Sequence, residues 1–377
     1  MAETLKTFFS PSLVRRIADD LQGVAPDFPS TAFVADACAG LEALELMARG
    51  RHLAEALARH LPPSYPEALD LVLRSLGPEH ARQELVGAGM APFYYLPHVL
   101  FVAERGLEHF DLSMRAQYEL TKRFTAEFSI RAYLAHDPER CLTFLQRWTR
   151  DENAHVRRLV SEGTRLRLPW ASRVPWLDRH PERIVALLEE LKDDPATLVR
   201  RSVANNLNDL GKVHPELLLS TCRAWSKGAS AERRALLQHA LRTAVKRGET
   251  GALALLGFAT RAALQIESVS FAPPKVAIGD QVEIRFTLRS TSAQPQDLLV
   301  DLAVFFVKAR GKRSAKVFKV KRLQLPARGR VELSTKVSLA IHTTRKPYPG
   351  RHEVDLRING EAFPLGAFEL LEPAGMP

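Results

Sequence analysis

Apolar residues recur every three or four positions through the first 265 residues, with short polar or proline-containing breaks between the runs. Leu41, Leu44 and Met47 form one such stripe, and Leu69 and Val72 belong to another. This spacing places the apolar side chains on one face of a helix. The region is therefore predicted to be a succession of amphipathic α-helices.

A two-helix repeat runs through the second half of this helical region. Pro138, Pro181 and Pro215 each precede a glutamate, lie 43 and 34 residues apart, and mark helix starts because proline favours the first helical position. The partner segments 151–158 and 194–201 are also 43 residues apart, and both end in Val-Arg-Arg. Two helices per unit and a period of about 33 to 47 residues are typical of a HEAT-type solenoid with an extended concave face.

After Leu264 the pattern changes to alternation of apolar and polar residues, with turns at Pro273-Pro274 and Gly279-Asp280. Further alternating segments are 298–307, 317–325, 331–339, 352–358 and 362–370. Six or seven strands in about 105 residues fit an antiparallel β-sandwich of immunoglobulin-like type. We therefore expect an all-α HEAT-like solenoid over 1–264, followed by this sandwich over 266–372.

The net charge is unevenly distributed between these two regions. The chain carries 53 Lys and Arg against 43 Asp and Glu, a formal net charge of +10. From Ile266 onward there are 18 basic and 11 acidic residues, so this part holds +7 and the first 265 residues only +3. A basic appendage on a near-neutral body suggests an anionic partner such as nucleic acid or a membrane surface. The alternative is a charged surface that only keeps the protein soluble.

The composition excludes several classes of protein. The content of 46% hydrophobic and 25% charged residues is ordinary for a globular chain, which excludes disorder and disulfide scaffolds. Cys38, Cys141 and Cys222 are too far apart for a disulfide framework or a zinc-ligand pair. No apolar run approaches the roughly 18 residues of a membrane span, and the N-terminus lacks a secretory pattern. We expect a cytoplasmic protein that associates with the nucleoid when bound to DNA.

The common enzymatic motifs are absent, including phosphate loops, His-Glu-x-x-His and Gly-x-Ser-x-Gly, so we expect no cofactor and no metal. Three segments instead carry arginine with carboxylate or amide side chains at four-residue spacing: Arg123, Glu127 and Arg131; Arg158 and Glu162; Arg201, Asn205 and Asp209. Residues four apart share a helix face, so three neighbouring helices should present parallel rows that face out of the core. Such a trough suits DNA held by its phosphates while a cationic intermediate is stabilised. The alternative is a set of exposed ion pairs, each contributing a few tenths of a kcal/mol.

Two further features bear on binding. The segment 308–322 contains eight basic residues and no acid, with a turn at Arg310-Gly311-Lys312, and is predicted to be a hairpin tip that straddles a DNA backbone. Lysine-rich strands also protect sheet edges from aggregation, which is the alternative. Trp170 and Trp176 follow prolines after Glu162 and could either stack on a sugar or base or cap the core.

Three segments resemble the AlkC branch of the AlkC/AlkD DNA alkylation-repair glycosylases. They are 123–131 (Arg-Phe-Thr-Ala-Glu-Phe-Ser-Ile-Arg), 153–170 (with Val-Arg-Arg-Leu-Val-Ser-Glu-Gly-Thr-Arg and then Leu-Pro-Trp) and 202–209 (Ser-Val-Ala-Asn-Asn-Leu-Asn-Asp). The resemblance covers essentially the whole chain, including the immunoglobulin-like domain that some AlkC members carry. It implies a base excision repair enzyme that removes positively charged N-alkylated bases such as 3-methyladenine and 3-methylcytosine.

By this resemblance Glu127, Glu162 and Asp209 are the catalytic carboxylates, with Arg158 and Trp170 as supporting contacts. A cationic alkylated base leaves readily, so the carboxylates need only stabilise an oxocarbenium-like sugar and position a water. No lysine stands beside the rows as a Schiff-base nucleophile, which predicts a monofunctional enzyme. Further DNA contacts are expected from Arg123, Arg165, Arg201, Asn205, Lys312, Arg313, Arg345 and Lys346.

The family also implies that DNA is recognised from its backbone side and sharply bent, with the sandwich acting as a clamp. An exposed DNA-binding face is most easily reconciled with a monomer on double-stranded DNA. Two other functions stay open: a HEAT-type scaffold that binds protein or nucleic acid without chemistry, and a strand-cleaving lyase.

Overall fold

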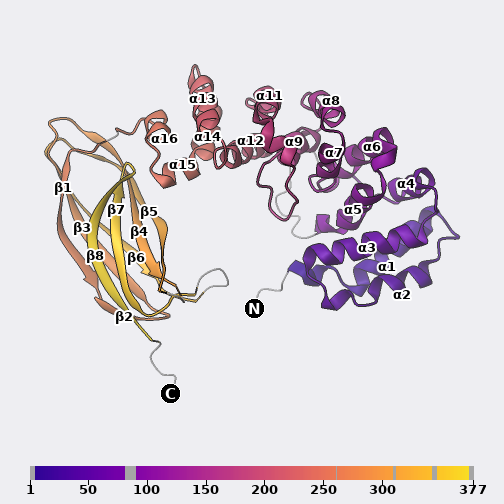
Figure 1. Ribbon diagram of the computed structural model, residues 1–377, viewed down its shortest axis with the longest axis horizontal. Helices are drawn as coiled ribbons and strands as arrows, with labels where there is room; N and C mark the ends of the chain where they lie inside the picture. Colours follow the sequence, from indigo (N-terminus) through magenta and orange to yellow (C-terminus); the bar gives the residue numbers. More distant parts are fainter. Residues whose placement is uncertain (1–4, 81–90, 260, 309–310, 342–345, 373–377) are drawn as a thin grey trace. The chain divides into compact units, whose positions relative to one another are not determined.

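The computed structural model describes residues 5–80, 91–259, 261–308, 311–341 and 346–372. The chain divides into two compact units, Met1–Ala240 and Leu241–Pro377. In the described residues the first unit is helical, and the second contains two short helices and all the strands (Figure 1). No helix in this part of the chain is long and apolar enough to cross a membrane.

Fourteen α-helices form the described part of the first unit. In chain order they are α1 (Pro11–Val24), α2 (Ser30–Cys38), α3 (Leu46–His60), α4 (Tyr65–Arg74), α5 (Leu96–Arg105), α6 (Phe110–Thr121), α7 (Ile130–His136), α8 (Pro138–Trp148), α9 (Ala154–Gly163), α10 (Pro175–Arg179), α11 (Pro181–Leu191), α12 (Thr197–Leu210), α13 (Pro215–Ser226) and α14 (Ala231–Ala240). Four 3-10 segments accompany them: η1 (Leu5–Phe8), η2 (Leu41–Ala43), η3 (Ala91–Tyr95) and η4 (Leu107–His109).

The predicted helix pairs are present. Pro138, Pro181 and Pro215 are the first residues of α8, α11 and α13, which confirms that they mark helix starts. In Figure 1, α8, α11 and α13 lie along one side of the stack and α9, α12 and α14 along the other. α12 packs between α9 and α14. The repeat therefore brings equivalent positions of α9 and α12 side by side.

The apolar stripes form the core between the helices. Val199, Val203 and Leu207 on α12 are completely buried. Trp148 and Trp225 are also buried. Burying a large aromatic side chain contributes roughly 1.5 to 3 kcal/mol or more to folding, so these two residues serve packing.

The predicted helical row of Arg123, Glu127 and Arg131 is wrong. α6 ends at Thr121 and α7 begins at Ile130, so Arg123 and Glu127 lie in the connection and only Arg131 lies on a helix. The Thr125 hydroxyl accepts a hydrogen bond from the Glu127 amide at 3.2 Å. Local bonds of this kind compete with the helical hydrogen-bond pattern, and here they help to end it.

The second unit begins with α15 (Arg242–Arg247) and α16 (Thr250–Leu255). Its strands are β1 (Leu264–Ala272), β2 (Lys275–Ala277), β3 (Gln281–Ser290), β4 (Gln296–Val307), β5 (Arg313–Leu325), β6 (Arg330–Ser338), β7 (Gly350–Ile358) and β8 (Glu361–Leu371). They form a three-stranded sheet, β1-β3-β6, and a five-stranded sheet, β2-β8-β7-β4-β5. The eight strands exceed the predicted six or seven. The three-residue β2 is too short for alternation to indicate it, and it pairs in parallel with β8.

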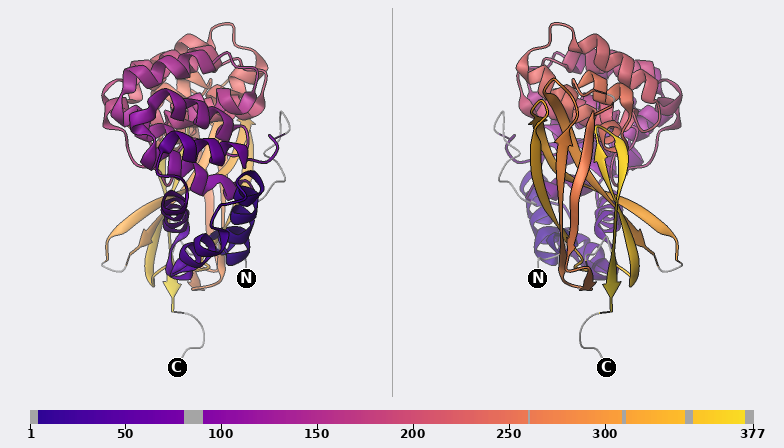
Figure 2. Two further views of the ribbon diagram at one scale, coloured as in Figure 1. Left: turned by 90° about the vertical axis from the view of Figure 1, so that its right-hand side faces the viewer. Right: turned by 90° about the vertical axis from the view of Figure 1, so that its left-hand side faces the viewer.

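The two sheets share one apolar core. Ile284 and Phe286 of β3 in the smaller sheet are fully buried in the same cluster as Leu302 and Val304 of β4 in the larger sheet. The strands of the two sheets are seen alongside one another in the right panel of Figure 2. This face-to-face packing is that of a β-sandwich.

The two short helices dock on the turn between β7 and β8. Asn359 and Gly360 form this turn with φ values of 49° and 83°, the left-handed region that Asn-Gly hairpin turns use. The Asn359 side chain donates a hydrogen bond to the Ala259 carbonyl at 3.0 Å. Gly248, just after α15, approaches Gly360 so closely that a Cβ on Gly360 would lie 2.6 Å from the Gly248 Cα. The helices therefore belong to the same compact unit as the strands, although the change from helix to strand comes later, at Leu264.

Replacing Gly360 by alanine is expected to destabilise the second unit more than Gly257→Ala. Both glycines have φ of 83°, so either alanine meets backbone strain. A Cβ at position 257 meets nothing within 4 Å, whereas at 360 it collides with Gly248. The collision should cost about 1 to 3 kcal/mol beyond the strain. Urea unfolding of the two variants measures the difference, and equal losses would contradict the close packing.

Candidate active site

Acidic and basic side chains alternate in a continuous chain of ion pairs across the first unit. Its members in order are Glu127, Arg158, Glu162, Arg165, Asp209 and Lys212, with nitrogen–oxygen separations between neighbours of 3.2, 3.9, 2.5, 2.8 and 2.7 Å. Glu127 comes from the connection before α7, and Arg158 and Glu162 come from α9. Arg165 lies in the loop after α9, and Asp209 lies at the end of α12. The three carboxylates identified from the sequence are thus brought together.

Glu162 occupies the centre of this chain. Its Oε1 accepts a hydrogen bond from Arg165 at 2.5 Å, and its Oε2 accepts one from the Ser202 hydroxyl at 2.6 Å. Burial by itself raises the pKa of the Glu162 carboxyl, but the Arg158 and Arg165 charges and the Ser202 hydroxyl outweigh it and hold that pKa below its ordinary value. Glu162 is therefore ionised at neutral pH although only 6% of its surface is exposed.

Arg165 joins the other two groups. Its Nε donates to Asp209 Oδ2 at 2.8 Å, and the second Asp209 oxygen accepts a hydrogen bond from Lys212 at 2.7 Å. Burial lowers the pKa of Arg165, but the two neighbouring carboxylates raise it to a net value above the ordinary one. A cation is therefore held permanently between two carboxylates, which balances the cost of burying them.

Glu127 stands at the edge of a cavity of about 250 Å³. The Thr125 hydroxyl donates to its Oε2 at 2.8 Å, and Arg158 Nη2 lies 3.2 Å from the same oxygen. The cavity is lined by Pro92, Phe93, Phe124, Thr125, Glu127, Phe128, Arg158 and Trp170. Aromatic faces beside a carboxylate attract a flat cationic group, because the ring faces and the carboxylate are both negative.

Trp170 differs from the core tryptophans. It is 56% exposed, and its φ of 61° lies in the left-handed region that a bulky residue rarely adopts. Strained, exposed residues at a cavity are characteristic of functional sites. Of the two interpretations of Trp170, a surface contact is favoured over a core cap. Trp176, in contrast, stacks on His180 with 4.2 Å between ring centroids.

The expectation that the polar rows face out of the core is wrong for two of the acids. Glu162 is 6% exposed and Asp209 is 1% exposed, and Arg165 pairs with both carboxylates. Arg201, in contrast, is exposed at the beginning of the same α12 row. The α12 row therefore begins at the exposed Arg201 and ends at the buried carboxylate of Asp209. Within the described residues, no three His, Cys, Asp or Glu side chains are grouped as metal ligands.

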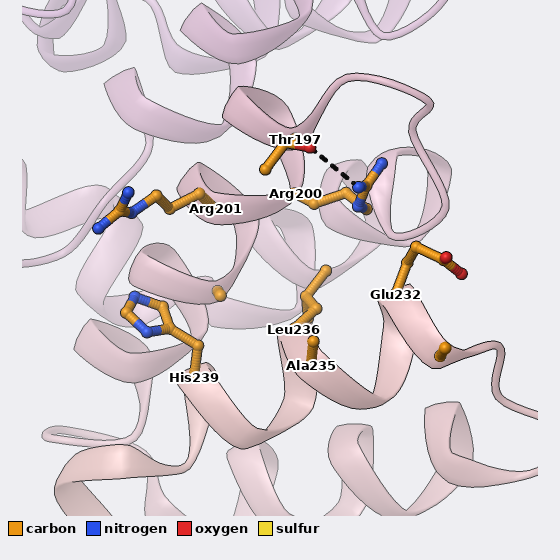
Figure 3. Close-up of a pocket in the computed structure, with 9 residues that line it drawn as sticks. Thr197, Arg200, Arg201, Glu232, Ala235, Leu236 and His239 are labelled. Carbon is orange, nitrogen blue, oxygen red and sulfur yellow. Dashed lines mark hydrogen bonds between the residues drawn. The ribbon is translucent and has the colours of Figure 1, made fainter. Parts of the chain in front are cut away.

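A groove of about 500 Å³ lies between α12 and α14. Figure 3 shows Arg201 and His239 at one end of it, Arg200 and Glu232 at the other, and Leu236 between them. His239 Nε2 lies 3.0 Å from the Asn205 Oδ1, within hydrogen-bond distance. Since Asn205 is one helical turn from both Arg201 and Asp209, the α12 row connects this groove to the chain of ion pairs.

Two predicted contacts of the first unit are placed differently. Arg123 does not join the ion chain, because its Nε donates to the Gly77 carbonyl at 2.5 Å and its Nη1 pairs with Glu119 at 3.0 Å. Arg165, predicted only as a DNA contact, is the cation between two of the carboxylates. The three-residue spacing from Glu162 predicts a pair on one helix face. The bond from Arg165 to Asp209 could not be predicted from the spacing.

The predicted contacts of the sandwich lie around the β4–β5 hairpin and the loop before β7. Lys312 is exposed in the hairpin turn, and Arg313 pairs with Glu353 at 2.6 Å. Lys346 is exposed, with its Nζ 5.9 Å from the Tyr348 ring centroid. Arg345 lies outside the described residues.

Some site residues were not identified from the sequence. Ser202 bonds to Glu162 from a position 40 residues away, and the aromatic wall of Phe93, Phe124 and Phe128 gives no local pattern. His239 could have been found from the sequence, because it lies 34 residues after Asn205, the same spacing as between Pro181 and Pro215. The repeat thus predicts a contact between Asn205 and His239 that was not identified from the sequence.

Acidification should weaken the first unit partly through Glu162. Because the folded pKa of this carboxyl is lowered, its ionised form stabilises the fold above the unfolded pKa of about 4.3, and the contribution is lost as pH falls through the folded pKa. Glu162→Gln lacks this titration. The difference in unfolding free energy between wild type and variant should therefore shrink from about pH 6 to about pH 3 in urea unfolding. A constant difference would mean that the ion pairs of Glu162 give no net stability.

Comparisons with known proteins match both units. A family model described as DNA alkylation repair enzyme matches residues 124–247, and one described as the C-terminal Ig-like domain of the uncharacterised protein YhaZ matches residues 265–372. The chain is 34% identical over 361 residues to YhaZ of Bacillus subtilis (strain 168), an uncharacterized protein, covering 95% of this chain and 96% of YhaZ. These matches confirm the predicted order of a helical region and an immunoglobulin-like domain.

A solved structure matches over nearly the whole length. It is the Pseudomonas fluorescens alkylpurine DNA glycosylase AlkC bound to DNA containing an abasic site analog, with a TM-score of 0.90 and 37% sequence identity. The match covers 98% of this chain and 100% of that chain. The segment that contains all six members of the ion chain lies within the alkylation-repair match.

Proposed function

This chain belongs to the AlkC branch of the DNA alkylation repair enzymes, and we propose that it is a monofunctional DNA glycosylase for cationic N-alkylated bases. The observation that carries the proposal is the chain of three carboxylates joined by two arginines beside an aromatic cavity. The similarity to an alkylpurine DNA glycosylase supports the reaction class. The proposed substrates are 3-methyladenine and 3-methylcytosine in double-stranded DNA.

The proposed chemistry is hydrolysis of the N-glycosidic bond. A base that carries a positive charge takes the bonding electrons and leaves as a neutral molecule, so no strong general acid is needed. The sugar becomes oxocarbenium-like, and water adds to its C1′ while a carboxylate accepts the proton. Glu127, Glu162 and Asp209 supply the negative charge for both steps. The product is an abasic site in an unbroken strand.

The positions of the carboxylates suit these two roles. Glu127 borders the aromatic cavity and is held there by Thr125 and Arg158, which supports a role for it beside a bound sugar. Glu162 and Asp209 are proposed to act through their charge, which water screens less because both side chains are buried. Preorganised charges of this kind need no rearrangement when the cation forms, which is why they accelerate its formation.

DNA is proposed to be held by exposed basic side chains of both units. Arg201, at the end of the α12 groove, would neutralise a phosphate near the site, and the basic residues of the β4–β5 hairpin would make further phosphate contacts. These contacts carry no sequence preference, as damage recognition requires. The clamp role of the sandwich and the expected monomer are part of the same proposal.

The decisive experiment measures base release from methylated DNA. Duplex DNA treated with a methylating agent is incubated with the protein in EDTA, and the released bases are separated and identified. We expect 3-methyladenine and 3-methylcytosine in solution, and strands that break only after alkali. Binding to DNA without release would favour the scaffold, whereas nicking without alkali would favour the lyase.

A further inference from the structure

The buried guanidinium of Arg131 ties together the two ends of the loop that follows α9. Its Nη1 donates to the Gly163 carbonyl at 2.9 Å and the Arg165 carbonyl at 2.8 Å, and its Nε donates to the Ser172 carbonyl at 2.7 Å. Gly163 is the last residue of α9, and Ser172 lies near the far end of the loop, three residues before α10 begins at Pro175. One side chain thus fixes both ends of the segment 164–172.

Arg131 is buried, and the hydrogen bonds of its guanidinium go to backbone carbonyls. Only 4% of its surface is exposed, and none of the ion pairs of the described residues includes it. Burial lowers the pKa of Arg131 to about 10, so the group is still charged at neutral pH. Carbonyl oxygens at a helix C-terminus carry partial negative charge and stabilise a cation there. The positively charged guanidinium of Arg131 therefore bonds to the backbone and does not pair with a carboxylate.

The loop held by Arg131 carries two residues of the site. Arg165, near its start, bridges the two buried carboxylates. Trp170, near its end, borders the aromatic cavity with a strained φ of 61°. A residue in this backbone conformation persists only when its surroundings hold it there. The three carbonyl bonds of Arg131 restrain this loop at both of its ends.

We propose that Arg131 is a positioning residue of the site. Its guanidinium fixes the segment 164–172 so that Arg165 holds the buried carboxylates in place and Trp170 borders the cavity. The effect on rate rests on the proposed glycosylase function. The placement of Trp170, in contrast, is a property of the free protein and can be measured without DNA.

Arg49 provides a matched control. It is also buried, at 6% exposure, and its guanidinium also donates only to carbonyls, those of Leu44, Lys6, Phe9 and Glu42 at 2.8 to 2.9 Å. None of these residues lines the aromatic cavity. Arg131→Ala and Arg49→Ala therefore remove the same kind of interaction, one at the proposed site and one away from it.

The kinetic test compares these variants in the full chain. In single-turnover release of 3-methyladenine, Arg131→Ala should be about 100-fold slower per folded molecule, while its affinity for DNA changes by less than about threefold. Arg131→Lys keeps the charge with fewer bonds and should fall between this variant and wild type. Arg49→Ala should keep the wild-type rate. Methylguanidinium should restore part of the rate of Arg131→Ala but not that of Arg131→Met, whose side chain fills the space.

The spectroscopic test follows Trp170 directly. Its fluorescence is isolated as the difference between each protein and the same protein with Trp170→Phe. The anisotropy of this emission should fall in Arg131→Ala and stay unchanged in Arg49→Ala, because only the first frees the loop. If Arg131→Ala does not fold, Arg131→Lys is measured in its place.

Two results would overturn the positioning role. One is a folded Arg131 variant with the wild-type rate and the wild-type Trp170 anisotropy. The other is an equal loss of rate in Arg49→Ala, which would show a general effect of stability. If the wild-type protein releases no base, the proposed function fails, and the anisotropy comparison still decides whether Arg131 positions Trp170.

Discussion

Glu162→Gln should slow release of 3-methyladenine by about 100-fold or more, because it removes the central negative charge that stabilises the cationic sugar. Asp209→Asn should act in the same direction. DNA affinity should not fall in either variant, since both changes remove negative charge from a protein that binds an anion. Single-turnover release and fluorescence-anisotropy binding to the same lesion duplex measure the two quantities separately.

Asp194→Asn is the control for this prediction. Asp194 is a buried carboxylate, 7% exposed, that pairs with Arg157 of α9 at 2.6 Å and lies just before α12. Its replacement also breaks a buried ion pair of α9, and neither Asp194 nor Arg157 lines the aromatic cavity. We expect a comparable loss of stability but wild-type release per folded molecule. Full activity of Glu162→Gln and Asp209→Asn would refute the assignment of the site.

The double substitution of Lys312 and Lys319 by glutamine should weaken DNA binding about tenfold or more at roughly 0.1 M salt. Both side chains are exposed, one in the β4–β5 turn and one on β5. Each lost phosphate contact removes about 0.9 from the slope of log affinity against log salt, so the slope should become less steep by up to about 1.8. Titrations of duplex DNA at several salt concentrations give both numbers.

Arg223 and Lys227 allow a matched comparison. Both are exposed at the end of α13. The helix α13 lies on the side of the stack opposite to α9, α12 and α14 (Figure 1). Their replacement by glutamine removes the same charge from the protein and should leave the slope nearly unchanged. If the two double variants behave alike, the basic hairpin contributes only general charge, and the clamp role is wrong.

Some helices and strands could be predicted from the sequence pattern, and others could not. Proline at the first helical position and apolar spacing identified α8, α11 and α13, because both signals act through neighbouring residues. The same local reasoning failed at 122–129. The four-residue spacing there predicted a helix, but the structure has none, and the Thr125 side chain competes for the backbone hydrogen bonds. The three-residue β2 was missed for a related reason, since its partner is β8 near the other end of the domain.

The order of helices and strands, the helix pairs and the three carboxylates could be predicted from the sequence, through local patterns, the repeat and the family resemblance. The three-dimensional structure was needed to show that Arg165 pairs with both Glu162 and Asp209 and that Trp170 is exposed. It also shows that Arg131 bonds to the backbone of the loop that carries Arg165 and Trp170. Periodicity and capping depend on residues within a turn or two. Burial of a charge depends on which side chain reaches it from a segment some forty residues away, and no local pattern records that contact.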